Sequence, residues 1–597
     1  MKKCKKLGGI LLAVIIVAVS LFSVTAANDP KDLTTHSYYA YQIFNAEGYQ
    51  RDSASNGNDS IVNVQWGSAF TTDAQKTDFI QGLKATAGAA NPFKAAERLE
   101  TAEDIVKVLS NYEDDSDIAK VFARYTAKFA VDNNLTPMAD TYQNGDTFAQ
   151  TGYYLFLDAT ETNNMEDVVA NAVVTKMKAN EAVNINVKVS IPTLEKKVKE
   201  NTYNSNAASE INTAYGEYKY GKGYNDAADY SIGDTVPFEL IGTMAEGMEY
   251  YDTYYYGFVD TLCKGLTFNP NAGVTVYVYN PDASGKYVQA SKELVADGKF
   301  TYTATKQPDG TTALTIACDD ILPISEVNTK SRIVVNYSAD LNNDAVVGYD
   351  GNENKAYLEY SNNPLPTPGG TTPSTGHTPE DVVIVFTYSL DVNKIDKNTG
   401  ASLDGAEFYL VNSQGKYYCK DASAADSLPY WGTAKDANVA KITPDANNVF
   451  TVRGLDKGVY KLIEAKAPTN YRPLDKPVVI DVNAVILPDN DKGTNSAADK
   501  AARKAAQNWN DGDAHSALLM QGGNALGYSV SLNEDNHYKP NANNYVTTDG
   551  AKVTVANEKT YILPGTGGDG TSLIYIIGGV LLAAAAGLFI VKRKTSK

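Results

Sequence analysis

Short runs in which apolar and polar residues alternate recur along most of the chain, and a period of two predicts strands. Such runs, for example "VTVYVYN" and "RIVVNYS", dominate residues 191–364, and residues 382–561 begin and end with strand patterns. Residues 28–190 mix the strand patterns "YYAYQIF" and "TGYYLFLD" with the segments "FKAAERLETAEDIVKVLSNY" and "DDSDIAKVFARYTAKFA", in which apolar residues recur at helical spacing. We therefore expect a mainly β protein of tandem immunoglobulin-like β-sandwiches, with an α/β-decorated first domain.

The stretch "NNPLPTPGGTTPSTGHTPED" has no apolar periodicity and is rich in Pro, Gly, Thr and Ser, which is typical of an exposed linker. The predicted order is a mixed α/β domain at 28–190, a middle sandwich at 191–364, a linker at 365–381 and a third sandwich at 382–561. The third sandwich contains the Ala/Lys-rich segment "SAADKAARKAAQNW", which we expect to form a helical insertion on the surface.

The two ends of the chain predict export and anchoring. Residues 1–27 join a lysine-rich start, an apolar core (Gly8–Phe22) and a run of small residues, which is the pattern of a secretory signal peptide. Near the other end, Ser572–Val591 is apolar enough to predict a transmembrane helix, and the basic tail after it is expected to stay inside the cell. Residues 562–597 are thus predicted to hold a short anchoring motif outside the membrane, a membrane span and a basic tail.

Composition excludes several classes of function. The formal net charge of −18 argues against binding nucleic acid, whose phosphates require a basic surface. The four histidines lie at no metal-ligand spacing, and the sequence has neither a phosphate-binding loop nor a G-x-S-x-G nucleophile elbow. We expect no metal, no cofactor and no conventional enzyme activity.

The cysteine count indicates that no framework of disulfide bonds stabilises the exported protein. After removal of a signal peptide only Cys263, Cys318 and Cys419 remain, and an odd count gives no disulfide framework. A Cys263–Cys318 bridge is possible, but the sequence favours three small buried side chains. A nearly disulfide-free secreted protein needs another way to resist unfolding.

In the third sandwich, strand alternation places one polar residue in register with apolar residues on each of three strands. These residues are Lys394 in "YSLDVNKID", Glu464 in "GVYKLIEAK" and Asn557 in "AKVTVANEK". A buried charge is costly unless it is paired, so one interpretation is a buried ion pair with a hydrogen-bonded Asn, or edge strands that reach water.

The second interpretation is covalent. Burial disfavours the charged forms, so it leaves a lysine as neutral amine and a carboxylic acid protonated. A neutral amine held against an Asn carboxamide is a nucleophile in attack geometry, and the acid can polarise the amide while ammonia leaves. The product would be a Lys394–Asn557 isopeptide bond promoted by Glu464.

The middle sandwich repeats this logic. Alternation puts Lys196 of "IPTLEKKVKE", Asp260 of "YYYGFVDTLCKGLTF" and Asn362 of "KAYLEYSNNP" on apolar faces. Lys197 would replace Lys196 if the strand were shifted by one residue. Asp234 is the alternative acid, although its context "SIGDTVPFEL" resembles a turn.

Two sets of motifs resemble known families. The pentapeptide Leu563, Pro564, Gly565, Thr566, Gly567, followed by an apolar span and a basic tail, resembles the LPxTG cell-wall sorting signal of Gram-positive surface proteins. The strings "NKIDKNTGASLDGAEFYL", "YKLIEAKAPTNY" and "VTVANEK" closely resemble the CnaB-type (SpaA-type) isopeptide domain of pilins. One departure is Asn470, which stands where that family usually has Gly; Asn tolerates a left-handed backbone.

The resemblance implies isopeptide bonds Lys394–Asn557 and Lys196–Asn362, with Glu464 and Asp260 as the acids. It also implies that a sortase attacks the Thr566 carbonyl and passes the chain to the cell wall or to a lysine of another subunit. The usual YPK motif around that lysine is absent; Lys188 in "NINVKVSIP" is the nearest candidate, with Lys176 and Lys178 as competitors.

These features predict the backbone subunit of a sortase-assembled pilus, secreted and covalently held at the cell surface. Its expected partners are a pilin-class sortase, a housekeeping sortase with peptidoglycan, further copies of itself, minor pilins and host surface ligands. The rival prediction is a monomeric wall-anchored adhesin that binds host matrix, which shares every motif except the polymerising lysine.

Overall fold

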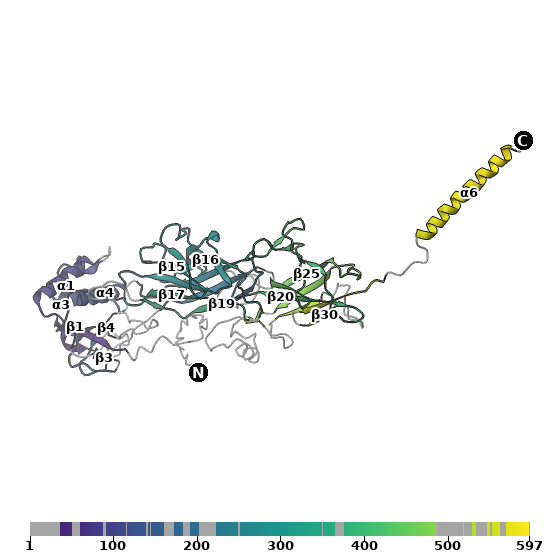
Figure 1. Cartoon of the computed structure of the whole chain (residues 1–597). Helices are drawn as coiled ribbons and strands as arrows, with labels where there is room; N and C mark the ends of the chain where they lie inside the picture. Colours follow the sequence, from purple (N-terminus) through teal and green to yellow (C-terminus); the bar gives the residue numbers. More distant parts are fainter. Residues whose placement is uncertain are drawn as a thin grey trace, which may run out of the picture.

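The structure is a computed structural model in which three bodies follow one another along an elongated molecule, with a separate helix beyond the last of them (Figure 1). It describes residues 36–50, 60–86, 91–114, 116–138, 141–143, 145–159, 172–182, 191–201, 223–248, 251–348, 350–364, 375–484, 486–487, 517–518, 528–532, 546–549, 552–561 and 569–595. The predicted signal peptide and the Ala/Lys-rich insertion lie outside these residues.

The first domain packs helices against a small antiparallel sheet of order β2-β1-β4-β5, with β3 paired to β1. Its strands are β1 (Tyr38–Gln50), β2 (Ser60–Trp66), β3 (Thr141–Tyr142), β4 (Gly152–Asp158) and β5 (Val173–Met177). Its helices are α1 (Asp73–Ala85), α2 (Pro92–Ala95), α3 (Ala102–Leu109) and α4 (Asp117–Asp132).

A capping box explains why the first predicted helical segment is split in two. The Thr101 side chain accepts a hydrogen bond from the Asp104 backbone, and the Asp104 side chain accepts one from the Thr101 backbone. This reciprocal pair starts α3 afresh after the short helix α2. Between helices and sheet, Phe44, Phe79 and Phe122 are fully buried and in ring contact, which builds the core of the domain.

The middle domain is the predicted sandwich of two sheets, in the order β14-β15-β10-β17-β19-β8 and β13-β12-β16-β9-β6-β7. The first sheet, in which β18 also pairs with β17, contains β8 (Ala227–Asp229), β10 (Tyr256–Leu262), β14 (Thr301–Lys306), β15 (Thr312–Cys318), β17 (Asn352–Ser361), β18 (Thr375–His377) and β19 (Asp381–Phe386). The second, in which β11 also pairs with β16, contains β6 (Leu194–Glu200), β7 (Gly223–Asn225), β9 (Thr235–Thr243), β11 (Leu266–Phe268), β12 (Thr275–Pro281), β13 (Tyr287–Gln289) and β16 (Arg332–Leu341).

The border between the middle and third domains differs from the prediction. Strands β18 and β19 both pair with β17, and β19 also pairs in parallel with β8. The middle sheet therefore continues to Phe386, and the third domain begins with the next strand at Tyr388. The boundary at 381/382 was wrong: β18 lies inside the predicted linker 365–381 and β19 begins at its last residue, so the Pro, Gly, Thr and Ser composition placed the border too early.

The third domain is a sandwich of sheets β24-β20-β31-β30 and β23-β22-β21-β25-β26-β29, with a separate pair β27-β28. Its first strand β20 lies parallel to its last strand β31. The strands are β20 (Tyr388–Asp396), β21 (Glu407–Asn412), β22 (Tyr417–Cys419), β23 (Tyr430–Gly432), β24 (Val449–Leu455), β25 (Gly458–Lys466), β26 (Val478–Ala484), β27 (Ile486–Leu487), β28 (Ala517–Leu518), β29 (Tyr528–Leu532), β30 (Val546–Asp549) and β31 (Lys552–Asn557).

Hydrogen bonds link consecutive domains. Between the middle and third domains, the Ile232 amide donates to the Gly454 carbonyl at 3.0 Å, and the Tyr388 hydroxyl donates to Asp229 at 2.8 Å. Between the first and middle domains, Lys128 of α4 donates to the Asp252 carboxylate at 2.7 Å. These contacts join domains that are neighbours along the molecule (Figure 1).

After the third domain, helix α6 (Asp569–Thr595) covers the predicted membrane span. Among the residues that the structure places, no helix meets the length and apolarity needed to cross a membrane. Cys263, Cys318 and Cys419 are free thiols, so no Cys263–Cys318 disulfide is present; Cys318 and Cys419 are buried and Cys263 is partly buried.

Candidate functional site: two buried lysine, acid and asparagine clusters

In the third domain the structure brings together the three predicted residues. Lys394 on β20 and Asn557 on β31 lie on neighbouring parallel strands of one sheet, and Glu464 reaches them from β25 of the facing sheet. The Lys394 ammonium donates to Asn557 Oδ1 and lies 3.1 Å from Glu464 Oε1. Asn557 Nδ2 donates to Glu464 Oε1 at 3.0 Å. Each of the three side chains therefore contacts the other two.

This cluster is sealed from water. The side chains of Lys394 and Glu464 are fully buried, and the Phe408 ring covers the Lys394 amine at 5.5 Å from its centroid. Burial lowers the pKa of Lys394 to about 8, although Glu464 acts in the opposite direction. The neutral amine, which is the nucleophilic form, is therefore far more populated near neutral pH than it is in an exposed lysine.

The middle domain holds a second cluster around Lys196 of β6. The Lys196 ammonium donates to Asp260 Oδ2 on β10 of the facing sheet and, at 2.9 Å, to the Tyr337 hydroxyl on β16 of its own sheet. Tyr337 in turn donates to Asp260 Oδ2 at 2.6 Å. Lys196 and Asp260 are thus brought into contact, and Tyr337, which sequence reasoning missed, bonds to both of them.

The asparagine of this cluster is Asn354, and the prediction of Asn362 is corrected by the strand register. On the paired strands β10 and β17, Asp260 lies opposite Ala356, and Asn354 lies opposite Leu262 on the same face. Asn354 is fully buried and its Nδ2 donates to the Tyr337 hydroxyl at 2.8 Å. Asn362 follows the end of β17, six residues from Ala356, or roughly 20 Å along a strand.

Burial shifts both ionisable groups of the middle cluster toward their neutral forms. It lowers the pKa of Lys196 and raises that of Asp260, against their mutual attraction. Asp260 Oδ1 and Asn354 Oδ1 are buried without a hydrogen-bond partner among the described residues. Two orphan acceptors are costly, and a proton on the Asp260 carboxyl would supply a donor that this cluster lacks.

The alternatives for the middle cluster are engaged elsewhere. Lys197 points away from the cluster, to Asp226 at 2.6 Å and Glu195 at 3.0 Å. Asp234 closes a turn by accepting from the Ser231 amide at 3.0 Å, as its sequence context predicts. The strand is therefore in the register that turns Lys196 inward.

The remaining predicted positions are the candidate acceptor lysines, the sorting pentapeptide and Asn470. Lys188 and the pentapeptide Leu563, Pro564, Gly565, Thr566, Gly567 lie outside the described residues. Lys176 is on β5, 3.6 Å from Asp114, and Lys178 is paired with Glu181 at 2.6 Å. Asn470 adopts the left-handed conformation that we expected it to tolerate, with φ of 68°.

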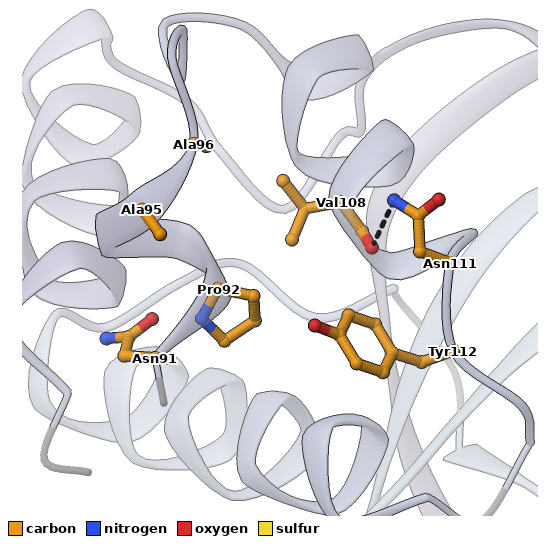
Figure 2. A pocket seen from close by; sticks show the side chains of 7 residues that line it. All are labelled: Asn91, Pro92, Ala95, Ala96, Val108, Asn111 and Tyr112. Carbon is orange, nitrogen blue, oxygen red and sulfur yellow. Dashed lines mark hydrogen bonds between the residues drawn. The ribbon is translucent and has the colours of Figure 1, made fainter. Parts of the chain in front are cut away.

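A shallow pocket of about 440 Å³ lies between α2 and α3 of the first domain (Figure 2). The side chains of its two asparagines already bond to nearby backbone carbonyls: Asn91 Nδ2 donates to Leu83 O at 2.9 Å, and Asn111 Nδ2 donates to Lys107 O at 2.9 Å. These local bonds make the pocket a weaker candidate than the two clusters. Across the described part of the chain, no group of His, Cys, Asp or Glu is arranged to hold a metal ion.

The third domain is similar in sequence to a known domain family. Residues 388–493 match the SpaA prealbumin-like fold domain. Over 361 residues the chain is 28% identical to the trypsin-resistant surface T6 protein of Streptococcus pyogenes serotype M6, a match that covers 56% of this chain and 60% of that relative. The chain is homologous to this surface protein and spans less than two thirds of its length.

The solved structures to which this chain is similar include three streptococcal pilus proteins. The T6 backbone pilin of Streptococcus pyogenes, described as a modular three-domain structure, is 16% identical with a TM-score of 0.44, covering 88% of this chain and 97% of that one. The pilus 2b backbone protein of group B streptococcus is 22% identical with a TM-score of 0.34, covering 56% of this chain and 97% of that one. RrgB from Streptococcus pneumoniae is 15% identical with a TM-score of 0.37, covering 70% and 82%.

Proposed function

We propose that this chain is the backbone subunit of a sortase-assembled pilus on a Gram-positive cell, and that its middle and third domains are each closed by an internal isopeptide bond. The observation that carries the proposal is the pair of buried lysine, acid and asparagine clusters in consecutive sandwiches, upstream of an LPGTG sequence. The homology to a streptococcal surface protein and the SpaA-type domain support it.

The cluster in the third domain has the groups required for the reaction. The neutral Lys394 amine attacks Cγ of Asn557, the N–Cγ bond forms, and the Cγ–Nδ2 bond breaks to release ammonia. Glu464 contacts both nitrogens, so it can take a proton from the lysine nitrogen and return one to the leaving amine. The middle cluster would join Lys196 to Asn354 with Asp260 as the acid.

Such bonds would replace disulfides as the source of robustness. A tensile load applied along the molecule would otherwise be carried by strand hydrogen bonds, each of which adds only about 1 kcal/mol net. A covalent link between β20 and β31 joins the first and last strands of the third domain directly. A subunit in a covalent fibre benefits from such a link because each subunit transmits the load to the next.

Assembly would use the sequence at the end of the exported part. A pilin-class sortase would cleave after Thr566 and join it to a lysine of the next copy, for which Lys188 remains the candidate. A housekeeping sortase would transfer the finished polymer to peptidoglycan. The expected location is the cell surface, with further copies, minor pilins and host surface ligands as contacts.

The test is the size of the product on cells. Cell-wall extracts should give an SDS-resistant ladder of high-mass species, and a Lys188→Ala variant should collapse it to a single subunit. A ladder that persists in that variant would move the acceptor to another lysine, such as Lys176 or Lys178. A wild-type protein that runs as one wall-linked species would overturn the pilus proposal in favour of a monomeric adhesin.

A further inference from the structure

The Tyr337 hydroxyl lies at the centre of the middle cluster. Tyr337 is almost completely buried, and its ring stacks on Phe238 at 5.3 Å between centroids. Its oxygen accepts from Lys196 Nζ at 2.9 Å and from Asn354 Nδ2 at 2.8 Å, while its proton goes to Asp260 Oδ2 at 2.6 Å. One hydroxyl therefore contacts the acid, the nucleophile and the leaving group of the proposed reaction.

In the third domain, the described residues make the contact between acid and amide without such an intermediary. There the amide nitrogen of Asn557 donates directly to the Glu464 carboxylate at 3.0 and 3.3 Å. In the middle domain, the hydrogen bonds that the structure gives Asn354 Nδ2 run to Tyr337 and none to Asp260. The shorter aspartate side chain therefore reaches the asparagine amide through a phenol, where the glutamate makes the contact itself.

Packing alone does not explain the hydroxyl. A phenylalanine would keep the stacking on Phe238 without burying a polar group, whose burial is favourable only when hydrogen bonds compensate it. Three hydrogen bonds to three chemically distinct groups satisfy the hydroxyl completely. Two of these bonds hold the Lys196 amine and the Asn354 carboxamide against the same hydroxyl.

We propose that Tyr337 is a catalytic residue of the middle domain that orients the Asn354 amide and passes a proton to its departing nitrogen. This inference rests on the proposed function, because it requires the Lys196–Asn354 bond. The glutamate-type cluster of the third domain does not need such a relay.

The proton balance closes within the cluster. As Lys196 Nζ bonds to Cγ of Asn354, the amine nitrogen becomes cationic, and its surplus proton passes to the Asp260 carboxylate that remains once the acid has released its own proton through Tyr337. Asp260 protonates the Tyr337 oxygen as Tyr337 protonates Nδ2, and the Cγ–Nδ2 bond breaks to release ammonia. Asp260 and Tyr337 end in their starting protonation states, and no further reactant is required.

The test is the rate of cross-linking in Tyr337→Phe within the full-length chain. The chain is produced in cells without sortase, denatured immediately after synthesis and refolded, and each bond is followed by the appearance of its cross-linked peptide in a digest. We expect the middle-domain bond to form about 100-fold more slowly, which is the usual contribution of one proton-transfer group. The third-domain bond should form at the wild-type rate.

A matched control is Tyr256→Phe. Tyr256 is another fully buried tyrosine of the same sandwich, and its hydroxyl donates to the Thr243 carbonyl at 2.8 Å, outside the cluster. Its loss removes one buried hydrogen bond and should leave both cross-linking rates unchanged. A Tyr337→Phe chain that forms the middle-domain bond as fast as Tyr256→Phe would overturn the proposal.

Two further readouts separate catalysis from folding. Site-specific 3-fluorotyrosine at position 337 keeps the shape but makes the phenol more acidic, so it should shift the pH profile of the middle-domain bond alone; an unchanged profile counts against proton transfer. If the wild-type chain never forms a middle-domain bond, the covalent part of the proposed function fails, a result distinct from a Tyr337→Phe chain that reacts normally.

Discussion

The middle and third domains place the same three kinds of residue in a buried sandwich core, yet they connect different parts of the fold. In the third domain, lysine and asparagine come from adjacent parallel strands of one sheet and the acid from the other. In the middle domain, the lysine comes from one sheet, whereas the acid and the asparagine come from the other. One bond would staple two neighbouring strands, and the other would staple two sheets.

This difference separates what the chemistry requires from what the fold supplies. Both clusters bury an amine beside an acid and an amide, so desolvation drives both lysines toward the neutral form. The route from acid to amide differs: it is direct from Glu464 and runs through the Tyr337 hydroxyl from Asp260. Strand register and side-chain length therefore decide how the proton travels.

The largest expected effect comes from removing one acid at a time. Asp260→Ala should abolish the middle-domain bond and leave the third-domain bond intact, and Glu464→Ala should do the reverse. An unpaired buried lysine also costs about 3–5 kcal/mol, so each variant should lower the unfolding free energy of its own domain. Peptide mapping shows which bond is missing. A bond that still forms without its acid would contradict the assignment of that residue as the acid.

A pair of asparagine variants sharpens the assignment in the middle domain. Asn354→Ala should eliminate the middle-domain cross-link, because it removes the carboxamide that contacts Tyr337. Asn362→Ala is the matched control, since Asn362 lies beyond the end of β17 and should leave the bond in place. The reverse pattern in a peptide map would restore the sequence-based choice.

The rate of the third-domain bond should depend on pH in a defined direction. The pKa of Lys394 is lowered to about 8, so the neutral fraction grows as pH rises and saturates above that value. We expect the cross-linking rate to rise roughly tenfold per pH unit from about pH 5 to about pH 8 and then to level off. Refolding followed by mass analysis measures it; a rate independent of pH would exclude the neutral amine as nucleophile.

The smallest expected effect is at Asn470, the departure from the family pattern in the third domain. Its φ of 68° is left-handed, where glycine has no steric penalty. Asn470→Gly should therefore change the unfolding free energy of this domain by no more than about 1 kcal/mol, with the cross-link unaltered. A thermal melt checks this, and a lost cross-link would mean that the Asn470 side chain supports the cluster.

The third-domain cluster could be predicted almost completely from the sequence. Alternation assigns Lys394, Glu464 and Asn557 to inward faces, and each strand offers one polar residue among apolar ones. Because each of these strands carries only one residue of the required type on its inward face, no choice between positions along the strand was needed. Face assignment was therefore sufficient there.

In the middle domain the face was predicted correctly and the position along the strand was not. Asn354 and Asn362 have the same parity, so alternation cannot choose between them; only the register of β17 on β10 does. Tyr337 was missed because "RIVVNYS" resembles an ordinary core strand. The available signal was chemical, since a buried tyrosine hydroxyl requires a partner.

The measurement that tests the central claim most directly is the intact mass of the recombinant polypeptide of residues 28–561 under denaturing conditions. The account predicts a deficit of two ammonia molecules, with peptide mapping placing one bond at Lys196–Asn354 and the other at Lys394–Asn557. A mass equal to that of the plain sequence would mean that both clusters are held only by hydrogen bonds and ion pairs, and it would contradict the covalent account of both domains.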